Sequence, residues 1–111
     1  MFFRKKISPY NVIDTVDFFD GEKTLTVNVR ADAASLVVGM RKVYARLSTV
    51  TDDSTDEEKA EAARFFAAVI FGQEQADKLC AFYRDPLTVI SACGKYFQDR
   101  LADKITKAQK K

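Results

Sequence analysis

Apolar and polar residues alternate over two stretches near the start of the sequence. The apolar positions of these stretches are Val12, Val16, Phe18, Leu25, Val27 and Val29. A period of two residues is typical of a β-strand with one buried face. Because only a short polar turn at residues 20–23 separates the stretches, residues 11–30 are predicted to form a β-hairpin.

The turn of this hairpin is compatible with two registers. A type I′ loop at residues 20–21 places Phe18 opposite Lys23, whereas a type II′ loop at residues 21–22 places Phe18 opposite Leu25. We favour the type II′ loop because it pairs apolar residues with one another across the strands. Both registers bury the same face, so the predicted core does not depend on the choice.

From residue 33 onward the apolar period changes to three and four residues, which is typical of amphipathic helices. The first helix is predicted to follow the capping residue Asp32 and to run to Leu47. The second is predicted at about residues 56–71. Its start is marked by a capping box at Thr55, and Gly72 is expected to close it with a left-handed backbone conformation.

Two further helices complete the pattern. One is predicted from Glu74 to Arg84, and the last begins at Pro86 and runs to about Ala108. Gly94 lies on the apolar side of the last helix, where a close backbone approach is expected. The apolar stripe of this helix consists of Val89, Ile90, Cys93, Phe97, Leu101 and Ile105. Beyond residue 101 apolar residues thin out and lysines accumulate, so this basic end is expected to project from the domain and fray.

These elements predict a single α+β domain, an N-terminal β-hairpin packed on a bundle of about four α-helices. The chain has 111 residues, of which 47% are hydrophobic, enough to bury one continuous core. Residues 1–10 are expected to form a flexible N-terminal arm, residues 11–30 the hairpin, and residues 33–108 the helices. The hairpin is expected to dock on the first and last helices.

The second helix carries more apolar side chains than one buried face requires. Phe66, Val69 and Ile70 form one face of its helical wheel. The remaining apolar or small residues point elsewhere, so the helix is either central in the domain, which the sequence favours, or a contact site. The candidates for contacts with a partner or a second subunit are Ala60, Phe65, Ala67, Ala68 and Phe71.

The residues needed for common catalytic chemistry are missing. The sequence contains no histidine, which removes the most common general base and most zinc ligand sets. Its four glycines form no phosphate-binding loop. Cys80 and Cys93 lie on separate apolar helical stretches and are interpreted as buried, reduced thiols. The sequence therefore predicts a protein that is not an enzyme and needs no cofactor or metal ion.

Charge gives little support for nucleic-acid or membrane binding. Eighteen basic residues against sixteen acidic ones leave a net charge of +2, far below the concentrated basic excess of a dedicated nucleic-acid binder. The basic residues 4–6 are more typical of a flexible terminus than of a membrane anchor. The longest apolar run, residues 65–71, is too short to cross a bilayer. We therefore expect a cytoplasmic protein that makes no membrane contact.

The order of these features resembles a known family. A hairpin with an Asp-Gly turn precedes helices, the stretch at residues 65–75 reads Phe-Phe-Ala-Ala-Val-Ile-Phe-Gly-Gln-Glu-Gln, and residues 94–97 read Gly-Lys-Tyr-Phe. Over about residues 11–107 the chain resembles the short tail assembly chaperones encoded by siphophages and prophages of Gram-positive bacteria. This resemblance implies a self-associating, mainly helical protein in the bacterial host cell. Its implied partner is the long helical tape measure protein, kept soluble before the tail tube is built.

Two other functions fit the same residues: a structural tail or head-completion component, and a nucleic-acid-binding accessory protein of a mobile element. Gene context separates the three, because a chaperone gene is expected beside a very long tape measure gene. The resemblance assigns no role to any individual residue. The contact candidates therefore rest on the helical wheel alone.

Overall fold

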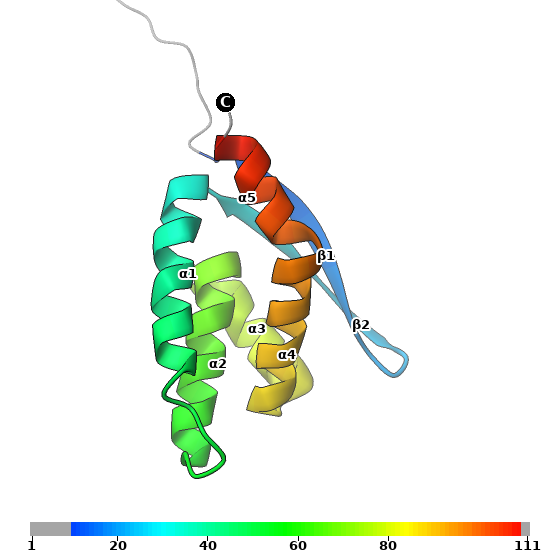
Figure 1. The fold of residues 1–111 in the computed structure, drawn as a ribbon. Helices are drawn as coiled ribbons and strands as arrows, with labels where there is room; N and C mark the ends of the chain where they lie inside the picture. The colour runs from blue at the N-terminus through cyan, green and yellow to red at the C-terminus, as the bar shows by residue number, and fades with distance from the viewer. Residues whose placement is uncertain (1–9, 110–111) are drawn as a thin grey trace, which may run out of the picture.

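The hairpin and the helices follow one another along the chain as the sequence predicts. The computed structural model describes residues 10–109, so the expected N-terminal arm lies outside the described residues except for Tyr10, as do Lys110 and Lys111. The fold is α+β (Figure 1). The elements are β1 (Val12–Asp20), β2 (Lys23–Ala31), α1 (Ala33–Leu47), α2 (Asp56–Phe71), α3 (Gln73–Tyr83), α4 (Pro86–Tyr96), the π-helical turn η1 (Phe97–Leu101) and α5 (Ala102–Gln109).

The hairpin adopts the register of the type II′ loop. Phe18 pairs with Leu25 and Asp20 with Lys23. Gly21 has a positive φ of 64°, whereas Glu22 does not have a positive φ. A type II′ turn requires a positive φ at its first central residue only, so glycine at position 21 fits this loop.

The predicted capping residues mark the helix ends. The Asp32 carboxylate accepts a hydrogen bond from the Ser35 backbone N–H at the start of α1. At the start of α2, Thr55 and Glu58 bond to each other's backbone N–H groups, which forms the expected capping box. Gly72, with φ 89°, ends α2 and separates it from α3. These local signals explain why the observed helix ends agree closely with the predicted ones.

The last helix contains a turn of π-helix that the sequence analysis did not predict. Within η1 the backbone N–H of Ala102 donates to the carbonyl of Phe97, five residues earlier. Apolar residues spaced four apart rotate by about 40° per step around an α-helix of 3.6 residues per turn. The wider π turn absorbs part of this rotation. As a result Leu101 and Ile105 both stay buried, and the expected projection of the chain beyond residue 101 is wrong as far as Gln109.

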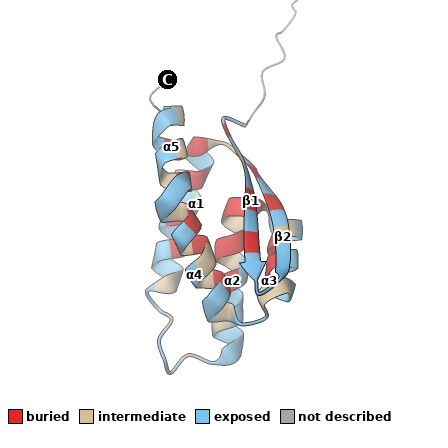
Figure 2. Ribbon diagram, turned by 90° about the vertical axis from the view of Figure 1, so that its right-hand side faces the viewer, coloured by how far each residue is buried: buried red, intermediate tan, exposed pale blue. Residues whose placement is uncertain are grey.

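The core lies between the hairpin and the helices, with α2 at its centre. Helix α2 packs against α1, α3, α4 and β2, as the central interpretation of this helix requires. Figure 2 shows buried residues on the strand and helix faces that point at one another. The largest fully buried side chains are Leu36, Ile70, Leu79, Leu101, Val12, Val27, Val29, Val43, Val89 and Cys93.

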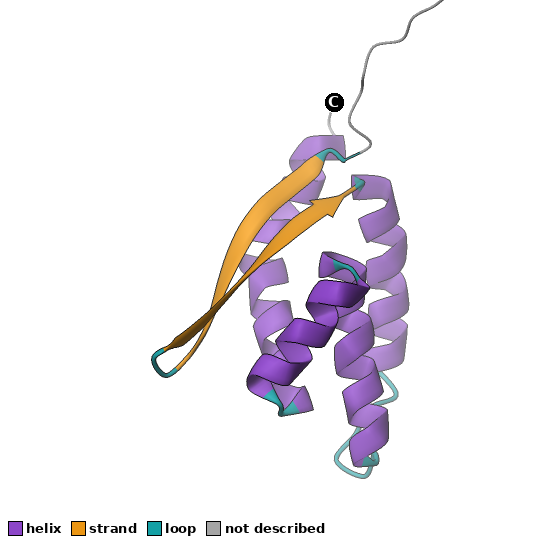
Figure 3. Cartoon of the chain, turned by 180° about the vertical axis from the view of Figure 1, so that it is seen from behind, coloured by secondary structure: helices purple, strands orange, loops and turns teal. Residues whose placement is uncertain are grey.

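The hairpin docks differently from the sequence expectation. It does contact the last helix, because β1 lies against α5 and Tyr96 bonds to Asp14, but β2 packs on α2 and α3. The expected docking on the first helix is therefore wrong as the main contact. Seen from behind, the hairpin crosses the helices obliquely and its loop projects beyond them (Figure 3).

The close helix approach occurs at a different glycine from the one expected. A Cβ atom built on Gly94 meets no atom within 4 Å, so no backbone approaches closely there. A Cβ atom on Gly39 of α1 would lie only 2.6 Å from the Cγ1 atom of Val69 on α2. The missing side chain of Gly39 therefore lets α1 and α2 pack tightly.

Candidate functional site

Two of the five contact candidates lie inside the domain's own core. Ala67 is fully buried, and Phe71 is only 6% exposed. The Phe71 ring makes an edge contact with Phe18 of the hairpin at 5.7 Å between centroids and stacks on Tyr96 at 5.8 Å. The placement of Phe71 and Ala67 on a contact surface is therefore wrong. A helical wheel of α2 alone cannot show that the hairpin and the last helix cover this face.

The other three candidates lie at or near the surface. Ala60 is exposed, while Phe65 and Ala68 are half-buried. Phe65 is one wall of a groove of about 450 Å³ that runs between α1 and α2. This α1–α2 groove is lined by Ala34, Ser35, Val38, Gly39, Lys42, Phe65 and Val69. Of the predicted candidates, Phe65 thus lines a shallow surface groove, and Ala60 and Ala68 are not part of its lining.

The groove exists because of the residue pattern on the outer side of α1. Gly39 places no side chain between the helices, so Val69 packs against its backbone and forms the groove floor. Val38, the residue directly before Gly39, is 50% exposed. Val38 was not among the predicted contact residues, although the sequence carries a signal for it: Val38 is an apolar residue on the face of α1 that otherwise carries charge. A single exposed apolar side chain is common on protein surfaces, but Val38 lines the groove together with Phe65 and Val69, and contiguous apolar surface is typical of a contact site.

Positive charge lies near one end of the α1–α2 groove. Lys42 is part of its lining, and the guanidinium carbon of Arg46 lies 5.0 Å from the centre of the Phe65 ring. This cation–π contact holds a basic group against the aromatic wall. On the α2 side, Arg64 forms an exposed ion pair with Asp77 of α3 at 3.3 Å. The groove is therefore an apolar surface with two basic side chains near one end.

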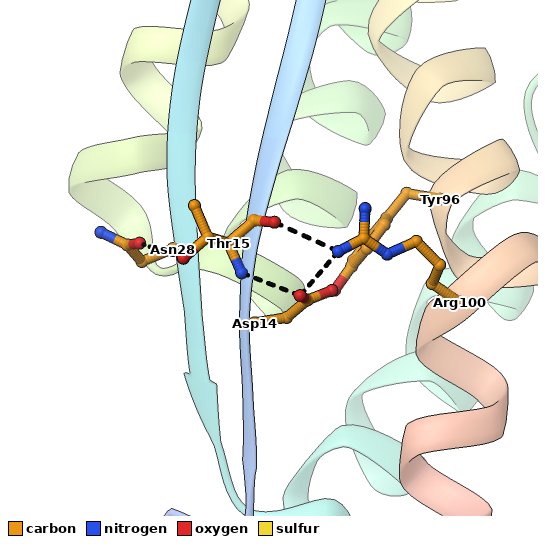
Figure 4. Close-up of polar contacts among 5 residues, drawn as sticks. All are labelled: Asp14, Thr15, Asn28, Tyr96 and Arg100. Atoms are coloured by element: carbon orange, nitrogen blue, oxygen red, sulfur yellow. Dashed lines mark hydrogen bonds and ion pairs between the residues drawn. The ribbon is translucent and has the colours of Figure 1, made fainter.

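A second group of polar side chains joins the hairpin to the last helix (Figure 4). The Tyr96 hydroxyl donates to one oxygen of the Asp14 carboxylate at 2.7 Å, and an Arg100 nitrogen donates to the other at 2.7 Å. Arg100 also donates to the backbone carbonyl of Thr15 at 3.2 Å. Every member of this cluster already has a partner within the chain, so the cluster acts as a clamp on the hairpin.

The clamp changes the proton affinity of its members. Burial by itself raises the pKa of Asp14, but the hydrogen bonds from Tyr96, from the Thr15 backbone and from Arg100 outweigh burial and hold that pKa below 3.8. Burial, followed by the nearby carboxylate, raises the pKa of Tyr96 well above 10. Both groups therefore keep one protonation state across the neutral range.

Neither cysteine has the surroundings of a reactive thiol. Burial raises the pKa of the Cys93 thiol to about 12 and also raises the pKa of Cys80. Because the thiolate is the nucleophile, both side chains are weakly reactive at neutral pH. Both are free thiols, as expected, but only Cys93 is buried; the predicted burial of Cys80 is wrong in part, because this side chain is half-buried. Within residues 10–109, no cluster of three or more Cys, Asp or Glu side chains is arranged to bind a metal ion.

Comparisons with known proteins assign no function to this chain, so the function is argued from the geometry of its surface. The chain matches no protein-family model, no curated protein and no solved structure. None of the helices between residues 10 and 109 has the length and apolar character required to cross a membrane.

Proposed function

We propose that this protein is a non-enzymatic protein-binding module that holds an amphipathic helix of a partner in the α1–α2 groove. The observation that carries the proposal is a shallow, mainly apolar groove that is lined by the half-exposed Val38 together with Phe65 and Val69. Helix-in-groove binding uses apolar side chains at helical spacing on the partner and needs no catalytic residue. Lys42 and Arg46 favour a partner helix with acidic residues at the corresponding end.

The partner that agrees with the sequence resemblance is a phage tape measure protein. We propose that the chain is a tail assembly chaperone that keeps this long helical protein soluble in the cytoplasm of the bacterial host while the tail is assembled. A chaperone of this kind needs apolar surface that covers the partner's apolar stripe and later releases it. We also propose that the chain self-associates, because several copies would cover a long helix more completely than one.

The test is coexpression of the protein with the tape measure protein encoded beside its gene. We expect the wild-type chain to increase the soluble fraction of the tape measure protein. Val38→Glu should abolish this effect, because it places an unpaired charge where the partner's apolar face binds. Leu87→Glu is the matched control: Leu87 is 51% exposed, close to the 50% of Val38, but does not line the groove.

Three results would contradict parts of this proposal. Equal solubilisation by both variants would show that the groove is not the binding site. A tape measure protein that aggregates with the wild-type chain would refute the chaperone function and favour a structural component of the particle. Light scattering of the protein alone measures self-association, and a monomer at high concentration would refute that part.

A further inference from the structure

The outer edge of β1 has one open position between two blocked ones. Thr15 and Asn28 pair across the hairpin. The N–H and carbonyl of Asn28 both bond to the Gln75 side chain, and the carbonyl of Thr15 bonds to Arg100. The backbone groups of these two residues therefore point away from the partner strand. Such pairs alternate along an antiparallel ladder, so the backbone groups of Asp17 and Phe19 also point outward from β1.

Side chains from the helices occupy the positions on both sides of Asp17. At Thr15, the N–H donates to the Asp14 carboxylate at 2.9 Å and the carbonyl accepts from Arg100. At Phe19, the carbonyl accepts from the Tyr83 hydroxyl at 2.9 Å. On the opposite edge, Gln75 blocks Asn28 in the same way. Side chains that bond to edge groups prevent unwanted strand pairing.

Asp17 itself faces a groove. The space between β1 and α4 has a volume of about 320 Å³. Four of its lining residues are aromatic, two are aliphatic and four are charged: Val16, Asp17, Phe18, Phe19, Tyr83, Ala92, Lys95, Tyr96, Asp99 and Arg100. Phe19 at its rim is 63% exposed. The outward N–H and carbonyl of Asp17 therefore border this groove, while both backbone groups of Thr15 and the carbonyl of Phe19 are already hydrogen-bonded.

From this arrangement we infer a second binding site, independent of the α1–α2 groove, in which a short extended segment of a partner protein adds to β1 at Asp17. A helix has no free backbone groups along its length to offer Asp17, whereas an extended chain offers an N–H and a carbonyl. The segment's residue opposite Asp17 should be basic, to pair with its carboxylate. The residues on either side point toward Val16 and Phe18 and should be apolar.

A second copy of this chain is a poor occupant of the β1–α4 groove. Two β1 edges related by a two-fold axis at Asp17 would place the two Asp17 carboxylates directly opposite each other, and like charges in that position are destabilising. A shift of the axis to Thr15 would require displacement of Arg100. The groove therefore favours a different protein with the pattern apolar–basic–apolar.

The experiment selects short random peptides displayed on yeast for binding to the full chain. Asp17→Pro removes the outward N–H without removing a ladder hydrogen bond, because Asp17 and Thr26 form a non-hydrogen-bonded pair. Thr26→Pro makes the same change on the opposite edge of the same pair and is the matched control. Both variants also lose the hydrogen bond between these two side chains. Thermal melting establishes that each variant folds.

We expect peptides with the apolar–basic–apolar pattern, bound about tenfold more weakly by Asp17→Pro and equally well by Thr26→Pro. N-methylation of the peptide residue opposite Asp17 should abolish binding, because the N–H of that residue is the donor to the Asp17 carbonyl. Should Asp17→Pro fail to fold, Ala92→Met fills the groove from α4 and should block binding instead. The inference is wrong if no peptides with this pattern are selected, or if the two proline variants weaken binding equally. It is also wrong if the chain forms a dimer that Asp17→Pro dissociates.

Failure of the peptide-binding site and failure of the proposed chaperone function give different experimental results. Val38→Glu changes the α1–α2 groove and should leave the selected peptides bound with unchanged affinity. Conversely, Asp17→Pro should leave the solubility of a tape measure protein unchanged.

Discussion

Gly39→Ala is expected to destabilise the domain, although alanine normally stabilises a helix relative to glycine. The new Cβ atom would lie 2.6 Å from the Cγ1 atom of Val69, about 1 Å closer than favourable carbon contacts. Valine in a helix has one strongly preferred χ1 rotamer, so this methyl group does not rotate away freely. Overpacking of this kind costs about 1–3 kcal/mol, against a helix-propensity gain of about 1 kcal/mol. The expected net loss is about 1 kcal/mol.

Gly94→Ala provides the matched comparison. It makes the same substitution within a helix, but its Cβ atom meets nothing within 4 Å. Only the propensity gain applies, so this variant should be stabilised by about 1 kcal/mol. The free energies of unfolding of the two variants should therefore differ by about 2 kcal/mol, measured by urea denaturation with equal m-values.

A double variant tests whether the contact with Val69 causes the loss. Val69→Ala removes the methyl groups that the new Cβ atom would meet, so Gly39→Ala should become stabilising in that background. If Gly39→Ala stabilises the otherwise unchanged chain as much as Gly94→Ala does, α1 and α2 do not approach closely at this point. Val69 would then not pack against the Gly39 backbone to form the floor of the α1–α2 groove.

Three further changes test the core, the hairpin and the clamp. Phe71→Ala should lower the free energy of unfolding by about 3–5 kcal/mol in urea denaturation, because the Phe71 side chain is buried in the core. A loss below about 1 kcal/mol would show that Phe71 is a surface residue. Val27→Asp buries an unpaired charge and should abolish cooperative thermal melting; an unchanged transition would contradict the hairpin's inward face. The folded-state pKa of Asp14 lies below 3.8, so its stabilising contribution is present above about pH 4 and lost as pH falls through the folded pKa. The stability difference between the wild type and Asp14→Asn should therefore shrink in that acidic range; a difference independent of pH would refute the clamp.

The parts of the fold predicted correctly are those specified by local chemistry. The loop at Gly21 fixed the hairpin register because only one of the two turn types paired Phe18 with Leu25. Asp32 and Thr55 marked helix starts because their side chains bond to backbone groups within the next three residues. None of these interactions depends on how distant segments pack.

The parts that were missed depend on contacts between distant segments. Phe71 looked like a contact residue because a wheel of its helix does not include Phe18 or Tyr96, which cover its ring. The close approach was expected at Gly94 because this residue lies on an apolar stripe, but the sequence does not show that Val69 of α2 lies against Gly39 instead. The outward edge of Asp17 also required the strand pairing and the two side chains that block its neighbours. Among the missed residues, Val38 could have been predicted from the sequence, because it is an apolar residue on a charged helix face.

The π turn at η1 affects how this chain can be aligned with any relative. Its hydrogen bond from Ala102 to Phe97 encloses one residue more than an ordinary helical turn. A relative with an uninterrupted α-helix would reach the same position in space with one residue fewer. A correct alignment must therefore place a single-residue gap inside η1, in the middle of a continuous helix. An alignment without that gap would shift all of α5 by one position and match Ile105, which is buried, to an outward-facing residue of the relative.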